Sequence, residues 1–311
     1  MVNLNKIINY RNKKWADNKL IPTWVDLKNI DLDQFYTKKE IALKCYESLI
    51  NKIKKDKGSI SNLKFIEPSA GEKAFFDLLP ENKRIGIDVM PSSKEIIKQD
   101  FLSWEPKKNG HSYVTVGNPP FGYRAWLALS FMNHAAKFSE YVGFILPMSF
   151  QSEGKGSPKH RVSGLKLIHS EFLPQNSFID PEGKEIKINA LWQIWKKGKN
   201  IIKKQKTCSK WLDIFTVDER KERLCGQKRI KEAKFFLQRT FYKEPPNLVK
   251  TFSEVKYVCG YGLVFKKENN KIIHVLRNTD WKKYSNLAAH NCRHISMEHI
   301  RKAITDMGYI D

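Results

Sequence analysis

The alternation of short apolar runs with helical patterns, over the first two thirds of the chain, most constrains the fold. Five runs have the length and character of strands: 64–71, 84–89, 113–121, 141–150 and 187–197. Residues 38–54 and 124–138, which lie between runs or beside them, place apolar side chains at helical spacing. Strands that alternate with helices predict an α/β fold with a mostly parallel, doubly wound sheet and helices on both faces.

The texture of the sequence changes near residues 196–206, where apolar periodicity gives way to the lysine-rich run KKGKNIIKKQK. We therefore predict a first domain over 1–200 and a smaller basic region of α/β or α+β type over 201–311. Ligands of open α/β sheets bind beyond the carboxyl ends of the strands. Chemistry is therefore expected in the loops that follow two of the runs, EPSAG and GNPPFG.

The charge of the chain favours an anionic partner. Its 311 residues include 56 Lys and Arg against 33 Asp and Glu, a net charge of +23. Residues 201–311 hold 24 of the cations and 12 of the acids, so this third is the more basic. Nucleic acid is therefore the leading candidate for a partner. A lysine-rich surface that only faces solvent would account for the composition equally well.

Cysteine usage and the first residues predict a cytoplasmic protein. The five cysteines have no C-x-x-C spacing, and the segment MVNLNKIINYRNKKW lacks the apolar stretch of a signal peptide. No apolar run approaches the roughly 18 residues that span a bilayer, so we expect no membrane partner.

Three acidic positions follow one another in an order typical of a nucleotide site. Glu67 ends an apolar run and is followed by the small residues Ser69, Ala70 and Gly71, which permit a ligand to approach the backbone. Asp88 ends the next run and could accept hydrogen bonds from two ribose hydroxyls. Asp100 could accept from the exocyclic amine of an adenine whose face the neighbouring Phe101 covers.

The sharpest motif is Asn118-Pro119-Pro120-Phe121, directly after an apolar run. The two prolines restrict the backbone and offer no N–H donor, so the motif is rich in acceptors. The Asn118 side-chain oxygen and the Pro119 carbonyl could hold both hydrogens of a planar amino group while Phe121 stacks on its ring. An Asn-capped Pro-Pro turn is the structural alternative, but the preceding acidic series disfavours it.

Together these motifs resemble the gamma-type S-adenosylmethionine-dependent N6-adenine DNA methyltransferases, over roughly residues 33–198. The resemblance implies a Rossmann-like methyltransferase sheet, S-adenosylmethionine as cofactor, double-stranded DNA as substrate and extrusion of the target base. It also allows a restriction-modification setting with a cognate endonuclease. The catalytic roles that it implies fall on Asn118, Pro119, Pro120, Phe121 and Phe178, with Phe178 stacking on the extruded base. The cofactor-binding roles fall on Phe35, Tyr36, Thr37, Glu67, Ser69, Ala70, Gly71, Asp88, Asp100, Phe101 and Asn118.

One residue departs from the family pattern. The first loop commonly reads G-x-G, whereas this chain has Gly71-Glu72-Lys73. We expect Lys73 to project to solvent from an ordinary backbone conformation and cofactor binding to survive. The open alternatives are an RNA adenine or protein glutamine N-methyltransferase, and a DNA-binding protein whose cofactor loop has decayed.

The region 201–311 is expected to read the target. Its cations are interleaved with aromatic residues in 228–242 and 281–284, a pattern that suits phosphates and base edges. The cluster His290-Asn291-Cys292-Arg293-His294, with His299, does not have the spacing of a zinc site, so no metal is expected. Ser296 is predicted to cap a helix instead.

Overall fold

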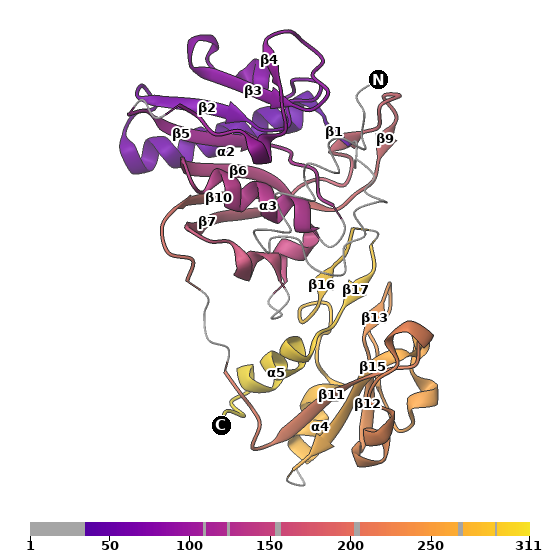
Figure 1. Ribbon diagram of the computed structural model, residues 1–311. Helices are drawn as coiled ribbons and strands as arrows, with labels where there is room; N and C mark the ends of the chain where they lie inside the picture. The colour runs from indigo at the N-terminus through magenta and orange to yellow at the C-terminus, as the bar shows by residue number, and fades with distance from the viewer. Residues whose placement is uncertain are drawn as a thin grey trace. The chain divides into compact units, whose positions relative to one another are not determined.

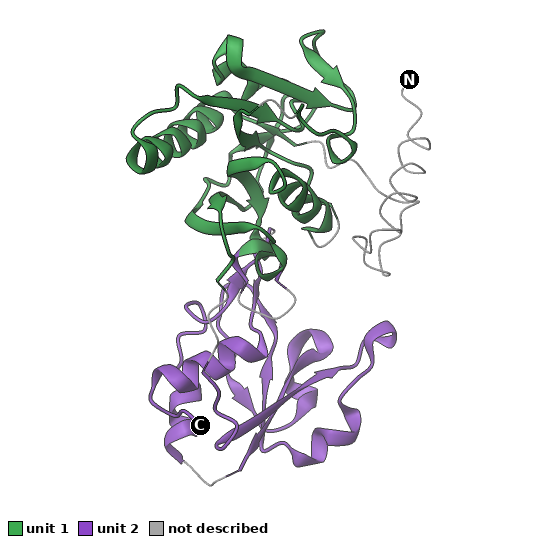
Figure 2. Cartoon of the chain, turned by 60° about the vertical axis from the view of Figure 1, so that its left-hand side comes forward, with its two compact units in different colours: residues 1–150, 158–201 green, residues 151–157, 202–311 purple. Residues whose placement is uncertain are grey.

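The computed structural model describes residues 35–107, 110–122, 125–152, 157–201, 206–266, 270–289 and 291–311. The chain forms two compact units (Figure 2): unit 1 comprises residues 1–150 and 158–201, and unit 2 comprises 151–157 and 202–311. The segment 151–157 thus belongs with unit 2, although it lies inside the predicted first domain. That unit 1 is catalytic and unit 2 reads the target stays a prediction.

Unit 1 is built on a sheet of seven strands in the order β4-β3-β2-β5-β6-β10-β7 (Figure 1). Strands β4, β3, β2, β5 and β6 are mutually parallel, whereas β10 runs antiparallel to both of its neighbours. Numbered along the chain, the parallel strands have the order 3-2-1-4-5 of the Rossmann fold. The bounds are β2 Leu63–Glu67, β3 Arg84–Asp88, β4 Ile96–Lys98, β5 Ser112–Gly117, β6 Ser139–Pro147, β7 Leu165–Phe172 and β10 Ala190–Lys197.

This architecture confirms the predicted Rossmann-like sheet, and each of the five predicted runs contains a strand. The predicted helices are α2 (Lys39–Lys57) and α3 (Trp126–Ala135), which lie on opposite sides of the sheet in Figures 1 and 2. The crossover from β2 to β3 contains only two short 3-10 turns, Phe76–Leu78 and Glu81–Lys83. The sequence patterns do not predict β4 and β7, because β4 has only three residues and β7 is an edge strand with a single buried residue, in which apolar and polar side chains are mixed.

Close packing joins α2 to the sheet. A Cβ on Gly143 of β6 would lie 2.7 Å from the Trp192 ring of β10 and 3.1 Å from Leu49 of α2, so only glycine leaves space there. The Trp192 ring also stacks on Phe75, with centroids 6.2 Å apart. This apolar layer holds the central strands rigidly, and their carboxyl ends form the site described below.

A small antiparallel sheet adds to unit 1. It consists of β1 (Tyr36–Thr37), β8 (Phe178–Ile179) and β9 (Glu185–Ile186), in the order β1-β8-β9. Thr37 pairs with Phe178, and the Lys38 N–H donates to the Ser177 carbonyl at 3.0 Å. These bonds fix the segment that precedes α2.

Unit 2 is an α+β unit whose strand pairs are antiparallel. One sheet has the order β11-β15-β12-β14 and a second has the order β13-β17-β16. Helix α5 begins after Ser296, whose side chain accepts from the His299 N–H at 3.2 Å, as predicted. The bounds are β11 Leu212–Asp218, β12 Phe235–Gln238, β13 Thr240–Phe241, β14 Leu248–Val249, β15 Cys259–Phe265, α4 Asn270–Arg277, β16 Asn286–Leu287, β17 Arg293–His294 and α5 Met297–Asp306.

Several predictions fall on residues outside the described part: the first 15 residues, four residues of the run 196–206, the start of the predicted helix 124–138, and His290. Among the helices of the described residues, none is long and apolar enough to cross a membrane. The same residues contain no group of three or more His, Cys, Asp or Glu side chains that could hold a metal ion.

Candidate active site

A cavity of about 300 Å³ lies where β2, β3 and β5 end, and it brings most of the predicted site residues together. Parallel strands place their carboxyl ends at one edge of the sheet, and the order of the strands reverses between β2 and β5, where a crevice is expected. The volume is that of a small-ligand site. The lining residues are Phe35, Tyr36, Pro68, Ser69, Gly71, Glu72, Asp88, Val89, Met90, Ser92, Gln99, Asp100, Phe101, Asn118, Pro119, Pro120, Phe121 and Phe131.

Asp88 ties the first loop to the end of β3. Its Oδ2 accepts from the Gly71 N–H at 2.8 Å, and its Oδ1 accepts from the Met90 N–H at 2.7 Å. Each carboxylate oxygen therefore keeps lone-pair capacity for one further donor from the cavity. Gly71 has φ +45°, and a Cβ there would lie 3.4 Å from the Tyr36 ring, so glycine suits both the turn and the close approach.

Asn118 connects the Pro-Pro loop to two other segments. Its backbone carbonyl accepts from the Ser69 hydroxyl at 3.0 Å, and its Nδ2 donates to the Phe35 carbonyl at 3.0 Å. The second bond fixes the orientation of the amide. Its Oδ1 is buried and has no hydrogen-bond partner within the described part of the chain.

Two further buried oxygens, Thr37 Oγ1 and Glu67 Oε2, likewise have no hydrogen-bond partner among the described residues. They line a second, smaller cavity of about 40 Å³ together with Asn118, Ser69 and Ala70. Buried acceptors without a donor are costly. Oxygens from β1, β2 and the loop after β5, without a partner among the described residues, thus converge on this small cavity.

Burial raises the pKa of the Glu67 carboxyl well above its usual range. The backbone N–H groups of Phe76 and Phe75 oppose this shift, while the charges of Asp88 and Asp77 add to it. Burial and the negative charges of Glu72 and Asp88 also raise the pKa of the Tyr36 hydroxyl. These shifts favour the protonated forms of both groups, and a cation placed beside Glu67 would instead favour its ionised form.

The two cavities are acidic inside a basic protein. Glu67, Glu72, Asp88 and Asp100 line them, and no lysine or arginine is among the described lining residues. Against a net charge of +23, this local excess of carboxyl groups favours a positively charged ligand.

Asp100 and Phe101 line the larger cavity. Asp100 precedes a 3-10 turn, Phe101–Ser103, and its Oδ1 accepts from the Leu102 N–H at 3.2 Å. The Phe101 ring is only 1% exposed and packs 5.2 Å from Phe131 of α3. Phe101 is therefore a fixed part of the wall, and Phe131 extends the same wall.

Phe178 does not line either cavity. It is 1% exposed and lies on β8 against β1. Phe121, Pro119 and Pro120 do line the larger cavity, at its wall beside Asn118. The structure thus brings together all of the predicted site residues except Phe178.

Lys73 departs from the expected backbone conformation. Its φ is +63°, in the left-handed region that the second glycine of a G-x-G loop would occupy without strain. Its N–H donates to the Ala70 carbonyl at 2.7 Å, and its Nζ lies 3.5 Å from Asp77 Oδ1. The expectation of an ordinary backbone is therefore wrong, but the side chain lies away from the cavity lining, as expected.

Several lining residues were not predicted from the sequence. They include Glu72 in the first loop, Met90 and Ser92 after β3, and Phe131 of α3. The Ser92 hydroxyl donates to the Gly71 carbonyl at 2.5 Å, a contact that no local sequence pattern indicates. Phe131 is recognisable as buried from helical spacing, but that spacing does not say which cavity the ring borders.

Comparison with known proteins gives weak likenesses. No protein-family model and no curated protein matches the chain. A putative RNA methyltransferase from Pyrococcus horikoshii is 18% identical with a TM-score of 0.40, over 53% of this chain and 88% of that one. Magnesium protoporphyrin IX methyltransferase from Synechocystis, with bound S-adenosylmethionine, is 10% identical with a TM-score of 0.37, over 64% and 98%.

The type IIL restriction-modification enzyme MmeI, in complex with DNA, is 11% identical with a TM-score of 0.42. The match covers 65% of this chain and 46% of that one, so this chain spans less than half of that enzyme.

Proposed function

We propose that the chain is an S-adenosylmethionine-dependent methyltransferase that modifies the N6 amino group of adenine in DNA. The observation that carries the proposal is the Asn118 amide. Its Nδ2 is held by the Phe35 carbonyl, and its Oδ1 is a buried acceptor without a partner in the described residues. An acceptor fixed in this way, beside a Pro-Pro corner that offers no proline N–H, suits a planar amino group.

The residues present fit the cofactor. Asp88 has acceptor capacity left for ribose hydroxyls, and Asp100 lies beside an aromatic wall that suits adenine. Thr37 Oγ1 and Glu67 Oε2 lie in the small cavity without a partner in the described part, which suits an ammonium group. The carboxyl-rich lining complements a ligand that carries both ammonium and sulfonium charges.

When bound, S-adenosylmethionine supplies a methyl group on a positively charged sulfur. The chain's residues would orient the attacking nitrogen. The Asn118 Oδ1 and the Pro119 carbonyl would accept from the two amino hydrogens and so orient the nitrogen lone pair for attack. The amine would become acidic only on alkylation, so its proton could leave late to water and the chain need not supply a strong general base.

DNA as the substrate is supported by charge and by the need for an exposed base. Residues 201–311 carry 24 Lys and Arg against 12 Asp and Glu, which suits a phosphate backbone. A duplex hides the adenine amino group, so the base has to be extruded at a cost of a few kcal/mol. Stacking on Phe121, which lines the cavity, would offset part of that cost.

The test measures transfer of labelled methyl from S-adenosylmethionine to unmethylated DNA, RNA and a protein lysate in parallel. We expect N6-methyladenine in DNA, and Asn118→Ala should abolish transfer while cofactor binding is largely retained. Asp77→Asn, at a half-exposed position of the 3-10 turn Phe76–Leu78, is the control and should be fully active. Label only in RNA or protein would refute the substrate, and cofactor binding without any transfer would refute the activity.

A further inference from the structure

The structure separates the aromatic residues of unit 2 into core and surface. Phe235, Phe236, Phe241 and Trp281 are buried in its two apolar clusters, so they cannot contact a partner. The pattern of cations interleaved with aromatic residues in 228–242 and 281–284 therefore does not mean that each of these rings is available to a partner. Tyr242 and Tyr257 remain, 54% and 56% exposed.

These two tyrosines lie together although they are distant in sequence. Their ring centroids are 6.1 Å apart, with an interplanar angle of 63°. Two rings so inclined form a corner in which a flat ring can stack on one face while its edge meets the other. Single exposed apolar side chains are ordinary on a protein surface, whereas clustered ones mark interaction sites.

The backbone under Tyr257 is strained. Tyr257 has φ +64°, and the following Val258 has φ +47°, which a β-branched residue almost never adopts. The strain is maintained from both sides. The Glu219 N–H donates to the Val258 carbonyl at 2.9 Å, and the preceding Val255 is anchored in an apolar cluster. Strained positions persist where the surroundings hold them, and they concentrate at functional sites.

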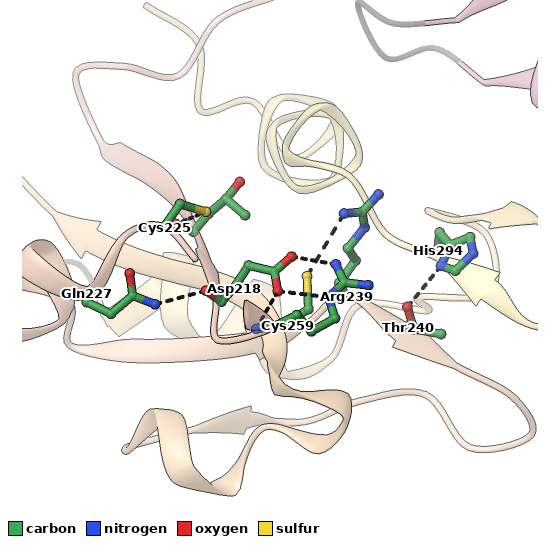
Figure 3. Close-up of polar contacts among 9 residues, drawn as sticks. Asp218, Cys225, Gln227, Arg239, Thr240, Cys259 and His294 are labelled. Carbon is green, nitrogen blue, oxygen red and sulfur yellow. Dashed lines mark hydrogen bonds and ion pairs between the residues drawn. The ribbon is translucent and has the colours of Figure 1, made fainter. Parts of the chain in front are cut away.

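A polar network fixes the two chain segments that carry the rings (Figure 3). The Arg239 N–H donates to the Cys259 carbonyl at 3.1 Å, and the Arg239 guanidinium contacts the Cys259 sulfur at 3.9 Å. On the same edge, Asp218 binds Arg220 through both carboxylate oxygens, and Thr240 bonds His294 at 2.9 Å. These contacts fix the backbone at Arg239 and Cys259, two to three residues from Tyr242 and Tyr257 in the sequence.

Two exposed lysines are the sequence neighbours of these tyrosines. Lys243 follows Tyr242 and Lys256 precedes Tyr257, both exposed, and neither forms an ion pair within the described residues. Arg229 and Lys302, by contrast, are already paired with carboxylates. Exposed aromatic faces flanked by available cations have the chemistry that binds bases and phosphates together.

We infer that Tyr242 and Tyr257 form a base-stacking platform through which unit 2 grips DNA, with Lys243 and Lys256 on the adjacent phosphates. The choice of DNA rests on the proposed function, whereas the stacking itself requires only a nucleobase. Stacking is tolerant of sequence, so the platform supplies affinity and base unstacking rather than recognition of particular bases.

The test is fluorescence anisotropy with the full chain and a labelled DNA duplex, alongside the same strand alone. Tyr242→Ala and Tyr257→Asn should each weaken binding about 5- to 100-fold. Asparagine is chosen at 257 because it tolerates the left-handed backbone. Tyr257→Phe keeps the ring and should bind like the parent chain. Met307→Ala, which removes another exposed apolar side chain of unit 2, is the matched control and should have no effect.

Two readouts separate stacking from a merely structural role. A 2-aminopurine in the DNA should be quenched by the parent chain and by Tyr257→Phe, but not by Tyr257→Asn. Lys256→Ala should make the negative slope of log affinity against log salt concentration shallower by about 0.7–0.9, while the quenching of 2-aminopurine fluorescence remains. Circular dichroism of each variant reports folding, and the aromatic-retaining variant keeps the test decisive if one of the others unfolds.

The outcomes distinguish this inference from the proposed function. Ring-independent DNA binding by a chain that methylates DNA would overturn the platform only. Ring-dependent DNA binding without methyl transfer would support the platform and count against the activity. If the parent chain binds neither duplex nor single strand, the platform is refuted, and the exposed tyrosines belong to a protein interface instead.

Discussion

Replacing Asp88 by asparagine tests how the first loop is held in the absence of any ligand. The carboxylate accepts one backbone N–H on each oxygen, Gly71 at 2.8 Å and Met90 at 2.7 Å. Asparagine has the same shape but only one acceptor oxygen. In either amide orientation, its NH2 faces a backbone donor, so at least one bond is lost and a donor–donor contact replaces it.

The magnitude follows from the bond that is lost. A hydrogen bond to a charged group contributes about 1.5–3 kcal/mol. Met90 is 50% exposed, so water can satisfy its N–H in part and the lower end applies on that side. We expect Asp88→Asn to destabilise unit 1 by about 1–3 kcal/mol, which corresponds to a fall in its melting temperature of roughly 3–10 °C for a unit of this size.

Urea unfolding followed by hydrogen exchange measures both the global and the local effect. The midpoint should fall without a change in slope, and the amides of 70–72 and 89–91 should exchange faster than in the parent chain. Asp77→Asn is the control, because Asp77 makes only a partly exposed ion pair with Lys73 and should cost less than about 0.5 kcal/mol. Unchanged exchange at Gly71 and Met90 in Asp88→Asn would refute the proposed tie.

Three other perturbations follow from the site. Burial raises the pKa of Glu67, so the folded state holds the Glu67 proton more tightly than the unfolded state does, and the free energy of unfolding should fall as pH rises from the ordinary pKa of 4.5 through the raised pKa. Glu67→Gln should flatten this dependence when urea midpoints are measured across pH. A Glu67→Gln profile identical to that of the parent chain would contradict the shift. Lys73→Gly should relieve the left-handed strain and stabilise unit 1 by about 0–1 kcal/mol in thermal unfolding, whereas Lys73→Ala, which keeps a Cβ, should not. Phe178→Ala should cost about 3–5 kcal/mol of stability because the ring is buried. Phe121→Ala, by contrast, should lower the rate of methyl transfer with little loss of stability. A Phe178→Ala chain that folds normally and fails only in base binding would support the stacking role for Phe178.

The central sheet could be predicted because strands buried on both faces are continuous apolar runs. The runs that contain β2, β3, β5, β6 and β10 all have this character. Strand β7 could not be found in this way, because it is an edge strand in which apolar residues are mixed with charged ones and most positions are half-exposed or exposed. Strands β1, β8 and β9 have two residues each and leave no periodicity to detect.

The site was predictable to the extent that it lies at strand ends. Glu67, Asp88 and Asn118 end or follow β2, β3 and β5, and the geometry of a parallel sheet brings such residues together. Phe178 shows the limit, since its burial depends on pairing with Thr37, a contact across 141 residues that no local pattern encodes. The conformation of Lys73 is another such case, because the turn geometry and not the residue type sets its φ.

The cavity is held open by bonds that need no ligand, and this arrangement has a thermodynamic consequence. Gly71 to Asp88, Ser69 to Asn118 and Asn118 to Phe35 join four segments of unit 1. They keep Thr37, Glu67 and Asn118 in place with buried oxygens that have no partner in the described part of the chain. Each such oxygen costs about 1–3 kcal/mol of stability. A ligand ammonium group beside Thr37 and Glu67 would recover that cost at those two oxygens, whereas the proposed partner of the Asn118 Oδ1 is the target amino group. Ligand binding should therefore stabilise unit 1 more than unit 2. A ligand that lacks the ammonium group should stabilise unit 1 much less than the area of its contact with the cavity would suggest.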